Sequence, residues 1–198
     1  MRGPYLGLTT LVALFALACS QDEAPAATEE APELSCATSA SAEALAERPS
    51  PLDSVMIDLG GAPAKLCYGR PSANGRTMVG GLDPFDAPWR MGSNEPTTLH
   101  LSSAATVGGI DVEAGSYSLY AIPTADVWTI VVNGNADRWG VPITDEVRAA
   151  DIGSFEVTPS ELEQPVETLT FSFEAADDGG DLVFSFETRT FAIPVRQR

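Results

Sequence analysis

Three arginines, Arg70, Arg76 and Arg90, fall within twenty-one residues of a chain that is otherwise poor in cations. A guanidinium group binds carboxylates and phosphates through paired hydrogen bonds, so such a cluster suits an anionic ligand. Trp89 would add a flat apolar surface on which a sugar ring could stack. The candidate ligand-binding residues of this stretch are Arg70, Arg76, Trp89, Arg90, Asn94, Glu95 and His100.

The same arginines could instead pair with acidic neighbours such as Asp83 and Asp86. A buried ion pair between Arg90 and Glu95, with Asn94 capping a turn, would fix the local backbone without any ligand. The sequence leaves open whether this stretch is a binding site or an internal scaffold.

Glu95 and His100 are the residues of this stretch that could act as acid or base in a hydrolase. His100 is the only histidine in the chain. A lone histidine in an alternating run is more often a hydrogen-bonded surface residue than a general base. No nucleophile-elbow pattern and no metal-ligand spacing of Cys and His accompany it. We therefore expect a non-catalytic protein without cofactor or metal, and the hydrolase remains the alternative.

The elements that must position these side chains are short strands. Apolar residues alternate within residues 55–59, 64–68, 98–101, 116–122, 127–132, 169–173, 182–186 and 191–195. Glycine-rich turns separate several of these runs, and residues 177–181 fit such a turn better than a calcium-binding loop. We expect a further turn at residues 187–190 and a single helical turn beginning at Thr158-Pro159.

This pattern predicts an all-β fold: a single antiparallel β-sandwich, jelly-roll-like, with about eight to ten strands. An open barrel is the alternative, because periodicity does not distinguish two packed sheets from a closed one. Residues 68–98, rich in Gly, Pro and Asn, are expected to form a long functional loop on this scaffold.

The N-terminal residues resemble an export signal followed by a lipid-attachment site. Residues 1–18 contain one arginine and an apolar run of a length typical of a signal peptide, and Ala16-Leu17-Ala18-Cys19 resembles a bacterial lipobox. Residues 19–50 are rich in Ala, Pro and Glu and are expected to form a flexible tether with a helical turn or two at 42–47. The sandwich domain would then span residues 51–198.

The remaining cysteines, Cys36 and Cys67, have two interpretations. In an oxidising compartment they could form a disulfide between the end of the tether and the first strands. Alternatively, Cys67 is a small buried apolar residue and Cys36 a free thiol.

The net charge of −17 excludes some partners. Nucleic acid and anionic lipid surfaces repel a field of this sign, so we expect membrane attachment through the lipid anchor only. Ser20 after Cys19 is not acidic and so favours the outer membrane over inner-membrane retention.

Several short motifs follow one another along the chain: Tyr68-Gly-Arg-Pro-Ser72, Asn74-Gly-Arg76, Gly80-Gly-Leu-Asp-Pro84, Trp89-Arg90, Gly92-Ser-Asn-Glu95, Thr97-Thr98, the run from Ala114 to Pro123, Trp128-Thr-Ile and Trp139-Gly140. Taken together in this order, they resemble the bacterial domain-of-unknown-function family 2911. Phe85, Met91 and Ser93 depart from the expected pattern. The resemblance implies a small envelope-associated β domain without an assigned activity, and it transfers no catalytic residue.

We therefore expect an envelope lipoprotein whose Arg/Trp-rich loop captures an anionic or carbohydrate-like ligand. Two alternatives remain, namely the hydrolase and an adaptor that docks another envelope protein through a strand edge.

Overall fold

Ten antiparallel strands form two sheets in the computed structural model of the chain, which describes Met1, Gly3 and residues 34–198. The larger sheet has the spatial order β1-β2-β3-β6-β7-β8, and the smaller has the order β5-β4-β10-β9. In the larger sheet the strands are β1 (Leu52–Leu59), β2 (Ala62–Gly69), β3 (Thr97–Leu101), β6 (Gly115–Pro123), β7 (Trp128–Asn133) and β8 (Asp151–Val157). In the smaller sheet they are β4 (Ala105–Val107), β5 (Ile110–Val112), β9 (Ser160–Ala176) and β10 (Gly179–Gln197).

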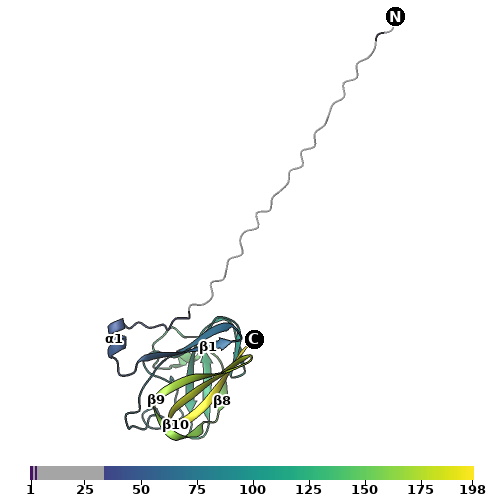
Figure 1. Ribbon diagram of the computed structural model, residues 1–198. Helices are drawn as coiled ribbons and strands as arrows, with labels where there is room; N and C mark the ends of the chain where they lie inside the picture. The colour runs from purple at the N-terminus through teal and green to yellow at the C-terminus, as the bar shows by residue number, and fades with distance from the viewer. Residues whose placement is uncertain (2, 4–33) are drawn as a thin grey trace. The chain divides into compact units, whose positions relative to one another are not determined.

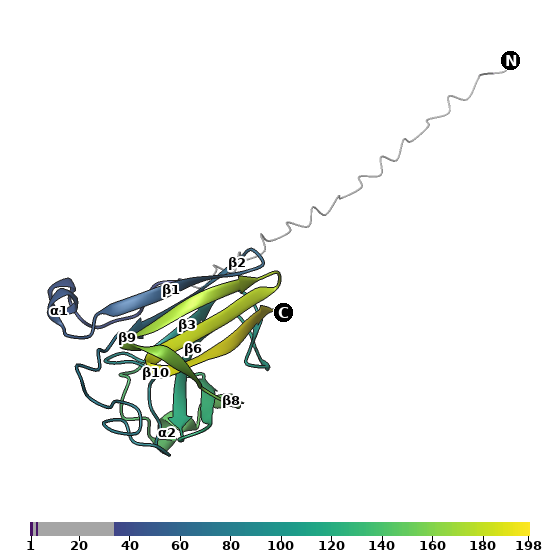
Figure 2. The same cartoon turned by 60° about the horizontal axis from the view of Figure 1, so that its bottom comes forward.

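The two sheets lie face to face, with β9 and β10 in front of β3 and β6 in Figure 2. Edge strand β1 of the larger sheet contacts β9 and β10, and β5 contacts β8 at the other side. The prediction of an all-β antiparallel sandwich with about eight to ten strands is confirmed. Residues 34–198 fall within one compact unit.

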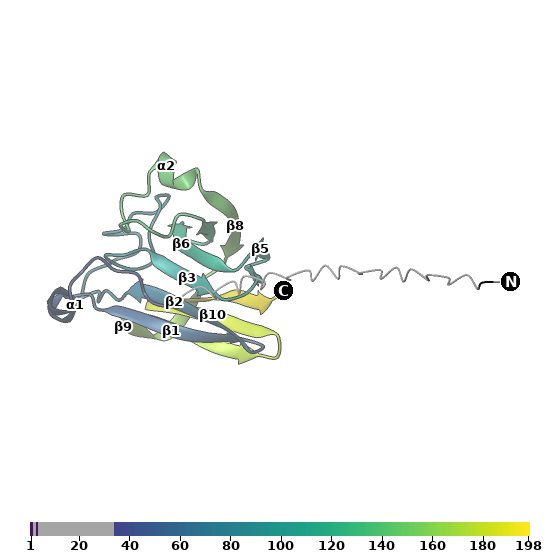
Figure 3. The same ribbon diagram turned by 90° about the horizontal axis from the view of Figure 1, so that it is seen from above.

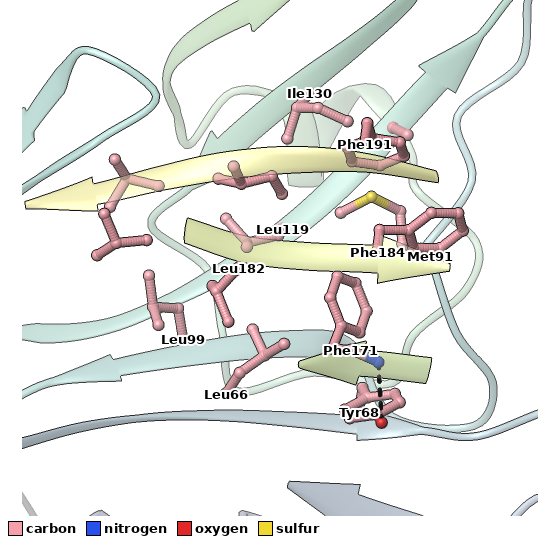
Figure 4. Packing of buried hydrophobic residues seen from close by; sticks show 14 of the residues in the cluster. Leu66, Tyr68, Met91, Leu99, Leu119, Ile130, Phe171, Leu182, Phe184 and Phe191 are labelled. Atoms are coloured by element: carbon pink, nitrogen blue, oxygen red, sulfur yellow. Dashed lines mark hydrogen bonds between the residues drawn. The ribbon is translucent and has the colours of Figure 1, made fainter. Parts of the chain in front are cut away.

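Alternation along the strands produces the core between the sheets (Figure 4). Leu66 and Leu99 are cross-strand partners on the inner face of the larger sheet, and both are fully buried. Leu182 and Phe184 on β10 pack toward them from the smaller sheet. Each such side chain contributes about 1.5–3 kcal/mol when it leaves water, which makes this core the main source of stability.

Tyr68, at the end of β2, connects the two layers. Its hydroxyl accepts a hydrogen bond of 3.1 Å from the backbone N–H of Phe171 on β9, and the two rings pack edge to face with centroids 5.0 Å apart (Figure 4). A buried tyrosine hydroxyl requires a polar partner, and this strand edge supplies one.

Two local predictions at the C-terminal end were wrong. The expected turn at 187–190 is a β-bulge inside the single long strand β10, where Glu187 has a φ of +53°. The expected helical turn at Thr158-Pro159 is a two-residue connection, because Ser160 already pairs with Thr190. Sheet pairing overrides the local helix-capping signal there. A short helix, α2 (Asp145–Arg148), occurs earlier instead.

Residues 34–50, here called the strap, lie on the domain rather than forming a free tether. Cys36 and Cys67 form a disulfide with their Cα atoms 5.5 Å apart, so of the two interpretations the structure has the disulfide. Helix α1 (Ala42–Glu47) occupies the stretch where a helical turn or two was expected. Figures 1 and 3 show α1 standing clear of both sheets. The prediction of a flexible tether therefore does not hold for residues 34–50.

The predicted signal peptide, the lipidation site Cys19 and the first part of the tether lie outside the described residues. Within the part of the chain that is described, no helix is long and apolar enough to cross a membrane.

Candidate ligand-binding site

A row of polar residues crosses the outer face of the larger sheet, the face turned away from the smaller sheet. Cross-strand pairing places Cys67 beside Thr98, Thr98 beside Ser118, Ser118 beside Asn133, and Asn133 beside Asp151. The row follows from strand alternation, because the chain neighbours Leu99 and Leu119 point into the core. Thr98 and His100 do point away from Leu99 and Leu101, as expected.

This outer face is covered rather than solvated. Ser118 and Asn133 are fully buried, and Thr98 is nearly so. The strap covers one part of the row through the disulfide at Cys67, and residues 134–150, here called the β7–β8 loop, cover another. Because polar groups of the sheet face polar groups of the strap and the β7–β8 loop, they can form a buried hydrogen-bond network or a ligand site.

Asp151 anchors the hydrogen-bond network at one end of the row. It accepts hydrogen bonds of 2.7 Å from the Tyr120 hydroxyl and from Asn133 Nδ2, and Asn133 Nδ2 also donates to the Val147 carbonyl at 2.7 Å. Burial, together with the bond to Asp151, raises the pKa of Tyr120 to about 12. The tyrosine therefore stays a neutral donor, and the network fixes the end of the β7–β8 loop to the sheet.

Arg138 shapes the other part of the same loop. Its guanidinium donates to the carbonyls of Asn135, Trp139 and Gly140 at 3.0–3.2 Å and to Ser118 Oγ at 3.3 Å. Burial lowers the pKa of Arg138. Nε and Nη1 of Arg138 donate to backbone carbonyls of the loop, and Nη2 does not. Arg138 therefore mainly stabilises the local backbone that carries Trp139.

Glu95, just before β3, is a buried carboxylate beside the outer face of the larger sheet. Its Oε1 accepts hydrogen bonds from Thr38 Oγ1 at 2.7 Å and from Arg48 Nη1 at 3.0 Å, and the Glu95 side chain is only 8% exposed. Its Oε2 is buried and has no partner among the described residues. Burial by itself raises the pKa of Glu95, but the bonds from Arg48 and Thr38 outweigh it and hold that pKa below its ordinary value. Glu95 is therefore an ionised carboxylate with one oxygen still able to accept a hydrogen bond.

A cavity of about 280 Å³ lies between the strap and the β7–β8 loop, with Glu95 at its wall. It is lined by Ala37, Thr38, Ser39, Glu95, Pro96, Thr98, Ala136, Asp137, Arg138 and Trp139. Trp139 is 52% exposed, which is unusual for a tryptophan. The cavity thus combines a carboxylate acceptor, hydroxyl groups and an accessible aromatic ring.

Glycine at position 140 lets the β7–β8 loop approach the segment that carries Glu95. Its N–H donates to the Asn94 carbonyl at 3.0 Å, and a Cβ atom there would overlap the backbone oxygens of Asn94 and Glu95. This backbone contact sets the separation between the two walls.

The arginines of the predicted loop do not converge on an open site. Arg70 donates to the Leu169 carbonyl and lies 3.5 Å from Asp53, so it links β2 to β9 and to β1. Arg76 donates to the carbonyls of Ala73 and Ser72 and closes its own turn. The guanidinium groups of Arg70 and Arg76 thus stabilise the fold. The sequence had left open whether these arginines form a binding site or an internal scaffold.

Arg90 does not form the expected ion pair with Glu95. Its Nε donates to the Gly92 carbonyl at 3.0 Å, and burial lowers its pKa. The partner of Glu95 is Arg48, which the sequence separates from it by forty-seven residues. Asn94, with φ of +63°, donates through Nδ2 to the Ser50 carbonyl and so ties the same segment to the strap.

Trp89 and His100 are both buried. Trp89 is only 5% exposed and packs edge to face against Trp128 and Phe184 in the core, so its ring offers no surface to a ligand. His100 Nδ1 lies 2.8 Å from Ser116 Oγ, and burial lowers the pKa of His100. Its Nε2 is buried and has no hydrogen-bond partner within residues 34–198. Of the predicted ligand-binding residues, Glu95 is the one that lines the cavity.

Sequence reasoning missed four residues of this site: Thr38, Arg48, Arg138 and Trp139. Two weak signals were available. Arg48 is the only base in the acidic segment 20–50, and Arg138-Trp139 repeats in reverse the Trp89-Arg90 pair. Within residues 34–198, no cluster of three or more Asp, Glu, His or Cys side chains could hold a metal ion.

The protein is thus an antiparallel β-sandwich with a small cavity, lined by both polar and apolar side chains, beside the covered outer face of its larger sheet. The family described as "Protein of unknown function (DUF2911)" matches residues 50–195, and the chain belongs to that family. Cys36, Thr38 and Arg48 precede the matched range, whereas Glu95 and Trp139 lie within it. Neither a curated protein nor a solved structure matches the chain significantly.

Proposed function

We propose that the protein is a non-catalytic binding module that captures a carbohydrate-like ligand in the cavity between the strap and the β7–β8 loop. The observation that carries this proposal is the Glu95 carboxylate: the residue lines the cavity, and its buried Oε2 has no hydrogen-bond partner among the described residues. A buried acceptor that lacks a hydrogen bond costs about 1–3 kcal/mol, and a ligand hydroxyl would recover that cost.

The chemistry of the lining favours a neutral polyhydroxylated ligand over an anion. Asp137 and Glu95 line the cavity with Arg138. Arg138 Nε and Nη1 already donate to backbone carbonyls, and Nη2 donates to Ser118 Oγ. An anionic group would meet two carboxylates and few free donors. Trp139 offers the half-exposed ring on which the apolar face of a sugar could stack.

The size of the cavity fits a ligand of about one sugar ring. Its volume of about 280 Å³ is near the lower limit of small-molecule sites, which are typically about 300–1,000 Å³. Hydroxyl groups of Thr38 and Thr98 would complement the hydroxyls of such a ligand.

Two observations weigh against the hydrolase alternative. The pKa of Glu95 lies below its ordinary value, whereas a general acid needs a pKa near the working pH. His100 does not line the cavity, and its pKa is lowered by burial. Both groups are poorly suited to proton transfer at this site.

We also propose that the protein is a bacterial lipoprotein, exported by a signal peptide and acylated at Cys19, with the outer membrane as the favoured location. The disulfide between Cys36 and Cys67 supports an oxidising compartment outside the cytoplasm. The domain would then sample ligands close to the membrane surface.

Binding can be tested by titrating the full-length protein in detergent with glucose, galactose, mannose and N-acetylglucosamine, and with glucuronate as an anionic comparison. Trp139→Ala should weaken binding of the best sugar by about two- to tenfold, since an aromatic contact contributes about 0.5–1.5 kcal/mol. Glu163→Gln, which changes an exposed glutamate on β9, is the matched control and should bind as wild type does. Absence of binding to every neutral sugar, or equal binding by Trp139→Ala, would contradict the proposal.

A further inference from the structure

The strap forms one wall of the cavity but buries little apolar surface of its own. Residues 37–39 line the cavity, and the next segment, α1, has no buried residue. Figures 1 and 3 show this helix projecting from the domain. The described ties of the strap are the disulfide at Cys36, the side-chain hydrogen bonds from Thr38 and Arg48 to Glu95, and the hydrogen bond that the Ser50 carbonyl accepts from Asn94 Nδ2. An element without an apolar anchor opens easily, so the covalent bond is its strongest attachment.

The ion pair beneath the strap is only partly satisfied. Arg48 Nη1 binds Glu95, but Arg48 Nε and Nη2 and Glu95 Oε2 are buried and have no hydrogen-bond partner in the described part of the chain. Removing two charges from water is costly unless their remaining hydrogen-bonding positions are filled. Both groups would therefore gain hydration if the strap moved away, and the disulfide acts against that tendency.

We propose that the Cys36–Cys67 disulfide is a redox latch: its reduction releases the strap, removes the cavity wall formed by residues 37–39, and exposes Glu95 to water. This inference rests on the proposed function in one respect, namely that the cavity is a ligand site. The release of the strap itself does not depend on a ligand. The oxidised form keeps Thr38 and Arg48 on Glu95. In the reduced form the site becomes an open, acidic surface without Thr38 as a ligand contact.

The reducing partner is a dithiol, and the exchange follows ordinary thiol–disulfide chemistry. One thiolate of the dithiol attacks Cys36 Sγ, because Cys36 is partly exposed whereas Cys67 is only 4% exposed. The S–S bond breaks, and Cys67 leaves as a thiolate that takes up a proton. The second thiol of the reductant then attacks the mixed disulfide, which releases Cys36 as a thiol. Two electrons pass to the protein, and the dithiol leaves as a disulfide.

The latch can be measured without any ligand, by hydrogen–deuterium exchange on the full-length protein in detergent. The oxidised protein is compared with the same protein held in dithiothreitol. We expect amides of residues 37–48 to exchange at least about tenfold faster after reduction, and strands β7 and β10 to be unchanged. Acrylamide should also quench the exposed Trp139 more strongly, and reoxidation should reverse both changes.

Two variants make the experiment decisive. Cys36→Ala supplies the unlatched form if dithiothreitol does not reach the bond, and it should reproduce the fast exchange. Thr38→Val in the oxidised state is the matched control, because it removes one contact but keeps the disulfide, and its strap should stay slow. Equal exchange of residues 37–48 in the oxidised, reduced and Cys36→Ala forms would overturn the latch, as would equal loosening of β7 and β10. Failure to bind any sugar would count against the proposed function but would leave this result intact.

Discussion

Glu95 lies 3.0 Å from Arg48 of the strap and forms no ion pair with Arg90, its near neighbour in the chain. The pair is almost inaccessible to solvent, with side-chain exposures of 8% for Glu95 and 12% for Arg48. It therefore connects a segment outside the family-matched range to the wall of the cavity.

Arg48→Met should strongly destabilise the domain, because it leaves the Glu95 carboxylate buried without a countercharge. We expect a loss of about 3–5 kcal/mol, and a smaller loss in the double variant Arg48→Met/Glu95→Leu, which removes both charges. Urea unfolding of the three proteins measures these differences. Asp53→Asn, which breaks the more exposed pair with Arg70, is the control and should cost less than about 1 kcal/mol. A double variant less stable than Arg48→Met would contradict this account.

The strands were predictable because their pattern is local. Alternation over a few residues determines which side chains face the core, and β1, β2, β3, β6 and β7 occur close to where alternation placed them. The bulge at Glu187 was not predictable in this way. It is stabilised by the distant N–H groups of Met78 and Val79, which bind the Glu187 carboxylate at 2.9 and 3.0 Å.

The site was less predictable than the fold. Glu95 belonged to the candidate loop, but Thr38 and Arg138 come from segments fifty-seven residues before it and forty-three after it. Strand register brings Thr98 beside Ser118, and the disulfide with the contacts of Thr38 and Arg48 holds the strap on the domain. Arginine density in the loop was misleading, because a long irregular loop needs donors for its own carbonyls.

Acylation at Cys19 predicts a simple change of location. Cys19→Ser should not incorporate radiolabelled palmitate and should move from the membrane fraction to the soluble fraction, because each buried methylene of an acyl chain contributes about 0.8 kcal/mol to membrane attachment. Cys36→Ser is the matched control: it changes a cysteine of the strap and should remain membrane-bound. A Cys19→Ser protein that stays with the membrane after a salt wash would refute the anchor.

Glu187→Ala should destabilise the domain and loosen residues 78–79. The substitution leaves two N–H groups without an acceptor at Met78 and Val79, which are nearly buried, and an unpaired buried group costs about 1–3 kcal/mol. Glu187→Gln keeps one oxygen and should lose less. Denaturant midpoints and amide exchange at Met78 and Val79 measure both effects, with Glu163→Ala as the exposed control. Wild-type exchange at these amides in Glu187→Ala would contradict the assigned role.

Stability should fall in two steps as the solution is acidified. Burial and the nearby charge of Lys65 lower the pKa of His100 from 6.5, so the unfolded chain takes up the proton first. The stability that comes from keeping His100 neutral is therefore complete above pH 6.5 and is lost as the pH falls from there through the lowered folded-state value. The pKa of Glu95 is likewise lowered from 4.5, so its contribution is present above that pH and is lost below it.

His100→Gln separates these two steps. Glutamine keeps a polar group near Ser116 but does not titrate, so the variant should lose the upper step and keep the lower one. Urea unfolding midpoints between about pH 2.5 and pH 8 measure both steps. Lys65→Gln is the matched control. Removing the Lys65 charge should raise the folded-state pKa of His100, so the upper step should become smaller but should not disappear. If His100→Gln and wild type lose stability equally between about pH 7 and pH 5, the buried histidine is not the group responsible, and the upper step must be assigned elsewhere.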